Sequence, residues 1–364
     1  MRRMKKILTA VLLLALTMSL AGCGESSGAK YSRAEKLLGE EKYDEAVKLL
    51  EELGVYGDAE KAARYAKAVL TAEGGDYASG IAAFKALGDY RDCPLMIPYY
   101  TARQYEDQAT DVNWSPRIMA AETYDPIVLF RDSKERAENC RKAVYDEAVR
   151  LAGTGQYGES TEMLAALHDY ADSEQLLQYY QAFALEQEDR FADASAAFAA
   201  MGDYRDAQAQ ATEVLQRGYQ KADAQERAGK QEAAYRIFLS LGDYEDAFER
   251  ANRPYYELGM KLREEKDWLA AVEAFERAGT YSDAEAQAKE TRYMQAEYKR
   301  EQQNWDEAIA IFTELGDYKD STTVQINETL WQKALALEAA GEQEAANELF
   351  KSLGRYRNAY ERVK

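Results

Sequence analysis

Histidine and cysteine are the scarcest residues of this sequence, with one histidine and three cysteines among 364 residues. No zinc-type Cys/His spacing, phosphate-binding glycine loop or nucleophile elbow is present. Paired carboxylates alone support glycosidic chemistry, and acids are abundant, but they recur with a repeat and are interpreted as helix caps and solvated faces. The sequence therefore predicts a protein that is not an enzyme and that holds no cofactor and no metal.

Basic residues are also in deficit. The chain has 46 Lys and Arg against 65 Asp and Glu, which gives a formal net charge of −19 at pH 7. Such a balance opposes binding to nucleic acid and binding to an anionic membrane surface by charge. We therefore expect no nucleic-acid partner.

Residues 1–22 are predicted to form a lipoprotein signal peptide. Basic residues at positions 2, 3, 5 and 6 precede an apolar run over residues 7–20, and the segment ends in Leu20-Ala-Gly-Cys23. These small residues before a cysteine resemble the bacterial lipobox, and the resemblance implies that Cys23 becomes the diacylated first residue after cleavage. An uncleaved membrane anchor is the alternative, for which the apolar run is short. Both interpretations place the rest of the chain on the extracytoplasmic face of the cell membrane.

Lipidation also accounts for one of the three cysteines. Cleavage removes four basic and no acidic residues, so the formal charge changes from −19 to −23. Two buried acyl chains give stable anchoring, and residues 23–30 are then the lipidated cysteine and a short polar tether. Cys93 and Cys140 are predicted to pack in neighbouring helices, with an axial offset of about 10 Å that is too long for a disulfide.

A seven-residue motif recurs through the rest of the chain, as in Leu241-Gly-Asp-Tyr-Glu-Asp-Ala247. Its aromatic residue lies at Tyr56, Tyr90, Phe130, Tyr170, Tyr204, Tyr244, Tyr281, Tyr318 and Tyr356. The interval between successive aromatics is nearly constant and has the length of one repeat unit, which predicts a solenoid. The glycine of each copy is predicted to end one helix in a left-handed conformation, and the two aspartates to cap the next helix. Such an acid pair lacks the dense oxygen ligands of a calcium loop.

Each repeat is predicted to contain two helices. The first carries an aromatic residue followed three positions later by a small one, as in Tyr65 and Ala68. The second carries a small residue, then a large residue four positions later and an apolar residue three beyond, as in Ala234, Phe238 and Leu241. These spacings place the residues on one face of a helix. The large residues predicted for the core are Leu50, Phe84, Tyr124, Leu164, Phe198, Phe238, Phe275, Phe312 and Phe350.

These helix pairs resemble the tetratricopeptide repeat (TPR). Small residues at the eighth and twentieth positions, a turn at the fifteenth and aromatics at the seventeenth and twenty-fourth match that family over residues 31–356. The resemblance implies an all-α, right-handed α-solenoid of about nine TPR-like helix-turn-helix repeats, and residues 357–364 are expected to form a C-terminal helical cap. Two departures are present: the Gly-Asp-Tyr motif replaces the closing proline, and positions four and seven are mostly polar, as at Arg64 and Lys67.

The repeats are not uniform in length. The interval from the motif aromatic to the small residue of the next first helix varies in steps near three, which predicts that some first helices gain one or two turns. In the third repeat, the two small residues Ala102 and Ala120 are further apart than their equivalents elsewhere, such as Ala68 and Gly80. The additional residues are expected in an inserted loop over residues 110–116, with Pro116 at a helix start. Trp114 in this loop is a candidate partner contact, or alternatively fills the wider gap between the helices.

The single histidine and most of the 27 tyrosines have structural interpretations. His168 replaces the glycine of the motif in its copy and is expected to be an exposed turn residue. Twenty of the 27 tyrosines coincide with repeated positions, so most are predicted to pack between helices and a minority to line a groove.

Two functions remain open at this point. The favoured one is a membrane-anchored extracytoplasmic scaffold that binds a protein or peptide partner, which is what TPR arrays usually do. The alternative is an envelope-assembly or substrate-capturing lipoprotein that binds cell-wall glycan or a cationic solute through acidic and aromatic surface. The repeats predict a binding surface but do not name its partner.

Overall fold

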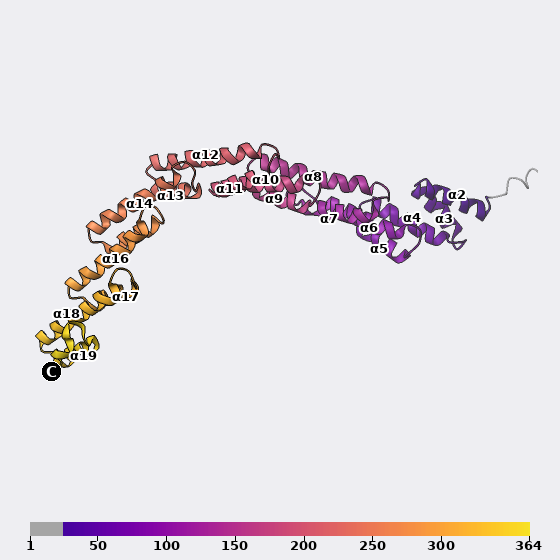
Figure 1. The fold of residues 1–364 in the computed structure, drawn as a ribbon. Coiled ribbons are helices and arrows are strands. Elements are labelled where there is room, and N and C mark those ends of the chain that lie inside the picture. Colours follow the sequence, from indigo (N-terminus) through magenta and orange to yellow (C-terminus); the bar gives the residue numbers. More distant parts are fainter. Residues whose placement is uncertain (1–24) are drawn as a thin grey trace, which may run out of the picture. The chain divides into compact units, whose positions relative to one another are not determined.

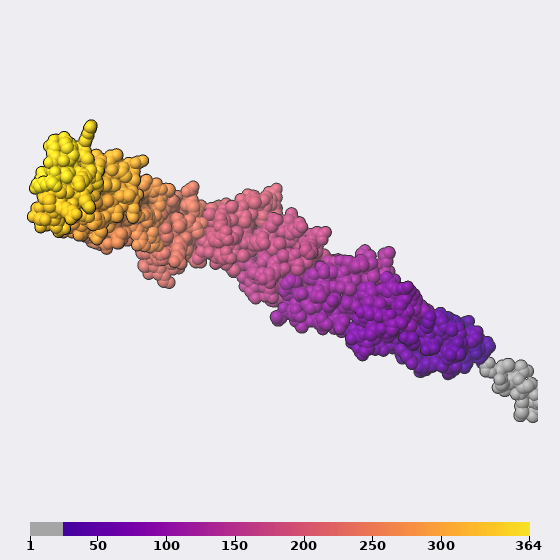
Figure 2. Space-filling view, turned by 90° about the horizontal axis from the view of Figure 1, so that it is seen from below, coloured from indigo at the N-terminus to yellow at the C-terminus, as the bar shows by residue number. Residues whose placement is uncertain are grey.

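The computed structural model describes residues 25–364, and every regular element in this range is a helix (Figure 1). The predicted signal peptide and Cys23 lie outside the described residues. The described chain divides after Gln181 into two compact units. Within each unit, the surface colour in Figure 2 changes gradually in chain order, as expected for repeats that contact their sequence neighbours.

The first unit contains four complete helix pairs. They are α2 (Ser27–Gly39) and α3 (Tyr43–Leu53), α4 (Ala59–Glu73) and α5 (Tyr77–Leu87), α6 (Cys93–Gln108) and α7 (Ser115–Tyr124), and α8 (Ser133–Gly153) and α9 (Tyr157–Ala166). A short 3-10 helix, η1 (Asp125–Ile127), follows α7. From α2 to α9 each helix packs against the next.

The second unit begins within a fifth pair, α10 (Ser173–Gln187) and α11 (Phe191–Ala200). Four further pairs follow: α12 (Ala207–Arg227) and α13 (Gln231–Ser240), α14 (Ala247–Glu264) and α15 (Trp268–Arg277), α16 (Ala284–Glu301) and α17 (Trp305–Glu314), and α18 (Ile326–Ala340) and α19 (Gln343–Leu353). The π-helix η2 (Ser321–Gln325) precedes α18, and the 3-10 helix η3 (Tyr356–Arg362) follows α19. Nine pairs between residues 25 and 364 confirm the predicted all-α solenoid.

The predicted core register is confirmed in every pair. All nine large residues assigned to the second helices are fully buried: Leu50, Phe84, Tyr124, Leu164, Phe198, Phe238, Phe275, Phe312 and Phe350. The small residues of the two helices are buried too, as Ala68 and Ala234 illustrate. Burying one such large side chain contributes about 1.5–3 kcal/mol, so the repeated slot is a main source of stability in each repeat.

First-helix lengths follow the spacing in the sequence. The shortest spacing gives the 15-residue α4, the intermediate spacing gives the 18-residue α14 and α16, and the longest gives the 21-residue α8 and α12. The last spacing, from Tyr318 to Ala334, is one residue longer than the intermediate spacing from Tyr281 to Ala296. The structure absorbs this residue in η2, where the Gln325 N–H donates to the Asp320 carbonyl at 3.1 Å.

The glycine of the motif has a positive φ, as predicted, but it does not continue a left-handed helical turn. Gly54 has φ 54° and ψ −116°, and the Tyr56 N–H donates to the Leu53 carbonyl at 3.1 Å. These values describe the first central residue of a type II′ turn, which glycine adopts without steric cost. The prediction of a left-handed glycine at the helix end is therefore correct for φ and wrong for ψ.

The predicted aspartate caps are wrong. The first aspartate of the motif, such as Asp243, is an exposed turn residue. The second, such as Asp246, is the N-cap residue, but its side chain makes no cap hydrogen bond. Its carboxylate instead accepts a hydrogen bond from the Tyr219 hydroxyl of the preceding first helix. The carboxylate was predicted to bind backbone N–H groups at the start of its own helix. It binds a tyrosine hydroxyl of the preceding repeat instead.

The same bond recurs along the described chain, and we call it the tyrosine–aspartate ladder. It consists of Tyr31–Asp58, Tyr65–Asp92, Tyr99–Asp132, Tyr145–Asp172, Tyr219–Asp246, Tyr256–Asp283 and Tyr293–Asp320. The two residues are 27 apart in six pairs and 33 apart in Tyr99–Asp132, because the third repeat is longer. Each rung joins a first helix to the loop that begins the next repeat.

The structure also tests the predictions for the N-terminal tether, the aromatic residues of the turns and the C-terminal segment. The tether predicted for residues 23–30 is too long, because α2 begins at Ser27 and the Ser26 hydroxyl accepts a hydrogen bond from the Ala29 N–H. The aromatic residues expected in the turns, such as Tyr77, are the first residues of the second helices. The C-terminal segment does close the last repeat, since Ala359 in η3 is fully buried and packs with Phe350.

Candidate functional site

The third repeat differs from the others where its two helices connect. Residues 109–114 separate α6 from α7, whereas residues 74–76 separate α4 from α5. Hydrogen bonds close the longer connection into a compact loop: the Thr110 N–H donates to the Asn113 carbonyl at 3.1 Å, and the Asn113 N–H donates to the Thr110 hydroxyl at 2.9 Å. The side chain of Val112 in this loop is 87% exposed.

Trp114 ends this loop as the N-cap residue of α7, and its side chain is half-buried. Pro116 lies in the first turn of α7, as predicted, and is buried. A half-buried indole can pack within the repeat on one side and contact a partner on the other, so its burial is compatible with both interpretations of Trp114. Contact between Trp114 and a partner stays a prediction.

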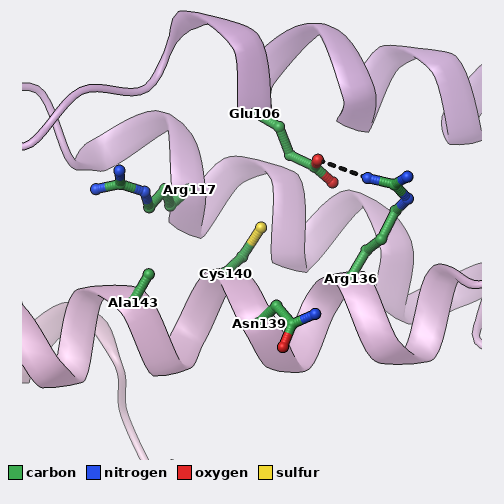
Figure 3. A pocket seen from close by; sticks show the side chains of 6 residues that line it. All are labelled: Glu106, Arg117, Arg136, Asn139, Cys140 and Ala143. Atoms are coloured by element: carbon green, nitrogen blue, oxygen red, sulfur yellow. Dashed lines mark hydrogen bonds and ion pairs between the residues drawn. The ribbon is translucent and has the colours of Figure 1, made fainter.

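A cavity of about 250 Å³, which we call the third-repeat pocket, lies beside the loop (Figure 3). It is lined by Glu106 of α6, Arg117 of α7, and Arg136, Asn139, Cys140 and Ala143 of α8. Arg117 links the pocket to the loop, because its guanidinium donates to the Thr110 carbonyl at 3.2 Å and to the Asp111 carboxylate at 3.5 Å. The insertion predicted from the sequence therefore forms part of the support of this pocket.

An ionic network holds one side of the third-repeat pocket. The Arg136 guanidinium donates to the Glu106 carboxylate at 2.9 Å, as Figure 3 shows, and to Asp132 at 2.8 Å. The Tyr124 hydroxyl donates to the other oxygen of Glu106 at 2.6 Å. Burial and the bond to Glu106 raise the pKa of Tyr124. The Glu106 carboxylate is thus held by two donors, which fix its position in the pocket wall.

The thiol in this pocket is protonated at neutral pH. Burial raises the pKa of Cys140 to about 11, and burial likewise raises the pKa of Cys93 to about 11. A thiol with such a pKa is a weak nucleophile. Both cysteines are buried and unpaired, which confirms that they are packing residues.

The hydrogen bonds of Arg117 are longer than those of Arg136, at 3.2 and 3.5 Å against 2.8 and 2.9 Å. The carboxylate neighbour of Arg117, Asp111, is 89% exposed and lies at the limit of hydrogen-bond distance. In Figure 3, Arg117 lies on the opposite side of Cys140 from the paired Arg136. The ion pair between Arg117 and Asp111 is therefore weak.

The structure confirms the interpretation of the single histidine. His168 is exposed and has φ 51° at the position that glycine occupies in most other motifs. Among residues 25–364, no three His, Cys, Asp or Glu side chains are grouped closely enough to hold a metal ion. No helix in the same range has the length and apolar character that crossing a membrane requires.

Sequence reasoning missed the cation that follows the motif aromatic. Arg91 adopts φ 53°, and its guanidinium lies 5.7 Å from the Tyr65 ring and 5.2 Å from the Tyr90 ring. Lys319 repeats the arrangement with φ 51° and a distance of 4.5 Å to the Tyr293 ring. Cation–π contacts of this kind contribute about 0.5–1 kcal/mol at exposed sites. A signal was available, because Arg or Lys follows the motif aromatic in several copies.

Comparison with known proteins adds little to this geometry. No protein-family model and no curated protein sequence matches the chain. Among solved structures, the TPR domain of P58(IPK) is similar at 12% identity over 93% of this chain and 96% of that chain, with a TM-score of 0.21. A circular tandem repeat protein is similar at 13% identity over 93% of this chain and 90% of that chain, with a TM-score of 0.20. Both superpositions are loose, so the helix pairs themselves define the fold.

Proposed function

We propose that this chain is a membrane-anchored, extracytoplasmic scaffold that binds a protein or peptide partner. The observation that carries the proposal is the series of nine helix pairs, in which α2 to α9 and α11 to α19 each pack against the next helix. Stacked repeats of this kind expose an extended surface, which suits a macromolecular ligand better than a small one.

The distribution of tyrosine hydroxyls favours protein over glycan as the ligand. Seven hydroxyls are bonded to aspartates in the tyrosine–aspartate ladder, and the Tyr90 and Tyr318 hydroxyls donate to Asp58 and Glu290 at 2.7 and 2.9 Å. The donors of these tyrosine hydroxyls are therefore already used in hydrogen bonds within the chain. A sugar that took hydrogen bonds from these hydroxyls as donors would have to break such bonds.

The proposed anchor is Cys23. Only residues 24–26 separate Cys23 from the start of α2 at Ser27, and the four peptide steps between them span at most about 14 Å. A lipidated Cys23 would therefore hold the first repeat close to the membrane surface. The repeats that follow it would supply the binding surface.

Affinity capture tests the proposed function. The tagged full chain, solubilised from membranes in mild detergent, is used as bait at low and at high salt, alongside purified cell-wall polymer. We expect specific proteins to be retained at low salt and released as salt rises, because the chain left after cleavage carries a formal charge of −23 and charge steers its partners. Retention of wall polymer through high salt, with no protein recovered, would instead establish the glycan-binding alternative.

A further inference from the structure

A second cavity, of about 420 Å³, lies between α13 and α14, and we call it the α13–α14 cavity. Tyr235 and Phe238 line it from α13, and Pro254, Tyr255 and Leu258 line it from α14. Its volume lies within the range of about 300–1,000 Å³ typical of ligand sites. Most of its wall is aromatic or aliphatic, unlike the charged wall of the third-repeat pocket.

A proline and two small residues border the space between these helices. Pro254 lies inside α14 and has no N–H, so the Arg250 carbonyl lacks its intrahelical donor. Small residues, Ala234 on α13 and Ala251 on α14, also line the cavity and do not fill it. Tyr235 and Tyr255 meet in an edge-to-face contact with their ring centroids 4.7 Å apart, which forms a rigid wall.

The charged groups at one end of the cavity are bonded to each other. The Arg250 guanidinium donates to the Glu226 carboxylate, to Asp223 at 2.9 Å and to the Tyr219 hydroxyl at 2.9 Å. It also lies 4.4 Å from the centre of the Phe238 ring. This network leaves little unsatisfied charge for a ligand to meet.

The charged groups beside the tyrosine wall are bonded as well. The Glu232 carboxylate accepts from the Tyr255 hydroxyl at 2.9 Å and from Arg277 at 2.7 Å, and the Arg277 guanidinium lies 4.3 Å from the Tyr255 ring. Apart from Gln231, what the cavity leaves open is therefore apolar and aromatic surface. Leu258 on its wall is 42% exposed, and Leu239 and Phe248 on the same two helices are 47% and 37% exposed.

We infer that the α13–α14 cavity is the anchor site for an apolar side chain on a basic peptide segment of the partner. This inference rests on the proposed function. The apolar wall favours an apolar side chain, because moving a Leu- or Phe-sized side chain from water onto such a surface strengthens binding of the peptide. Charge complementarity favours basic residues on either side of this anchor, since the chain left after cleavage has a formal charge of −23, attracts a basic segment and repels an acidic one.

A defined peptide tests the inference with the full chain in detergent. The probe is a fluorescein-labelled ten-residue peptide with Phe-Leu at its centre and lysines on both flanks, and its control has Ser-Ser at the centre. Binding is followed by fluorescence anisotropy, with each peptide also titrated into detergent alone. A second version carries photo-leucine at the central leucine, so that mass spectrometry can identify the residues it contacts.

Matched leucine variants locate the site. Leu258→Glu places a charge on the apolar wall, whereas Leu269→Glu changes a leucine of α15 that is 75% exposed and is not part of the cavity wall. We expect Leu258→Glu to weaken binding of the Phe-Leu peptide about tenfold or more. The Leu269→Glu variant should bind within about twofold of wild type. Both variants should keep the wild-type circular dichroism spectrum, because both leucines are at least partly exposed.

The photo-leucine crosslinks are expected in residues 231–240 and 247–264, and Leu258→Glu should abolish them. Equal affinity of the two variants, equal binding of the Ser-Ser peptide, or crosslinks elsewhere would each overturn the anchor site. A peptide that fails to bind wild type would also overturn it. None of these results touches the scaffold function, which depends on whether the affinity capture recovers a protein.

Discussion

The tyrosine–aspartate ladder can be tested at one rung by a double-mutant cycle. The Tyr293 hydroxyl donates to Asp320 at 2.8 Å, the Tyr293 side chain is 7% exposed, and Gln325 donates to the other oxygen of Asp320 at 3.1 Å. Hydrogen bonds to charged groups contribute about 1.5–3 kcal/mol. Asp320 is half-buried and keeps a second donor, so we expect the coupling energy between Tyr293→Phe and Asp320→Ala to be about 1–2 kcal/mol.

Protonation of Asp320 at low pH should remove the contribution of the Tyr293–Asp320 hydrogen bond to stability. The bond from Tyr293 lowers the pKa of Asp320 below its ordinary value. A carboxylate with a lower pKa in the folded state stabilises the fold above its unfolded pKa, and this stabilisation is lost as pH falls through the folded pKa. The wild-type protein should therefore lose stability below about pH 4. The Tyr293→Phe variant should lose less over the same interval.

Hydrogen exchange measured by mass spectrometry reports the local free energy of opening in α16 and η2. Tyr235→Phe is the control, because the Tyr235 hydroxyl meets only the Arg277 carbonyl, at 3.4 Å, and is not part of the ladder. A coupling energy below about 0.5 kcal/mol, or an equal acid response of Tyr293→Phe and wild type, would refute the view that the ladder joins neighbouring repeats.

The register and the candidate contacts give three further predictions. Phe312→Ala removes a fully buried ring and should cost about 3–5 kcal/mol, whereas Asp317→Ala changes an exposed turn residue and should stay within about 0.5 kcal/mol; equal melting shifts would contradict the register. Cys23→Ala should abolish partitioning into the detergent phase, and a variant that stays in the membrane fraction with its signal attached would rule out lipidation. Trp114→Ala should weaken capture of the partner with little change in melting temperature; a large loss of stability with capture intact would make Trp114 a core residue.

Helix number and length were predictable because one steric rule repeats. A large residue must fill each second helix and a small residue must lie at a fixed spacing from it, so Phe84, Phe275 and their equivalents set the register. Extra residues inside a first helix then lengthen that helix, as in α8. Even the one-residue excess before Ala334 was visible in the sequence, although its accommodation in η2 depends on how the turn packs.

The use of the aspartates was not predictable from local pattern. A carboxylate beside a helix start suits the backbone N–H groups, and nothing within the motif shows that a tyrosine of the preceding repeat arrives there. The constant sequence separation, as between Tyr256 and Asp283, was the available signal. This separation becomes meaningful only once the tyrosine of a first helix is known to reach the loop that begins the next repeat.

A third small position in each repeat was also overlooked. The residue after the second aspartate of the motif is buried, as Ala247 and Ser173 show. Cys93 occupies this position, which explains both its burial and its lack of a disulfide partner. The α13–α14 cavity could not be predicted from the sequence for a different reason. It depends on the distance between two helices near Pro254.

Crosslinking in intact cells tests the central claim most directly. The full chain carries a photoreactive amino acid at Val112 in one strain, and at Leu258 in another, and crosslinked products are identified by mass spectrometry. Both side chains are exposed, Val112 by 87% and Leu258 by 42%. A scaffold predicts discrete crosslinks from these positions to extracytoplasmic proteins, and their loss in the Cys23→Ala strain. Crosslinks to cytoplasmic proteins alone, or no protein crosslink from either position, would contradict the account.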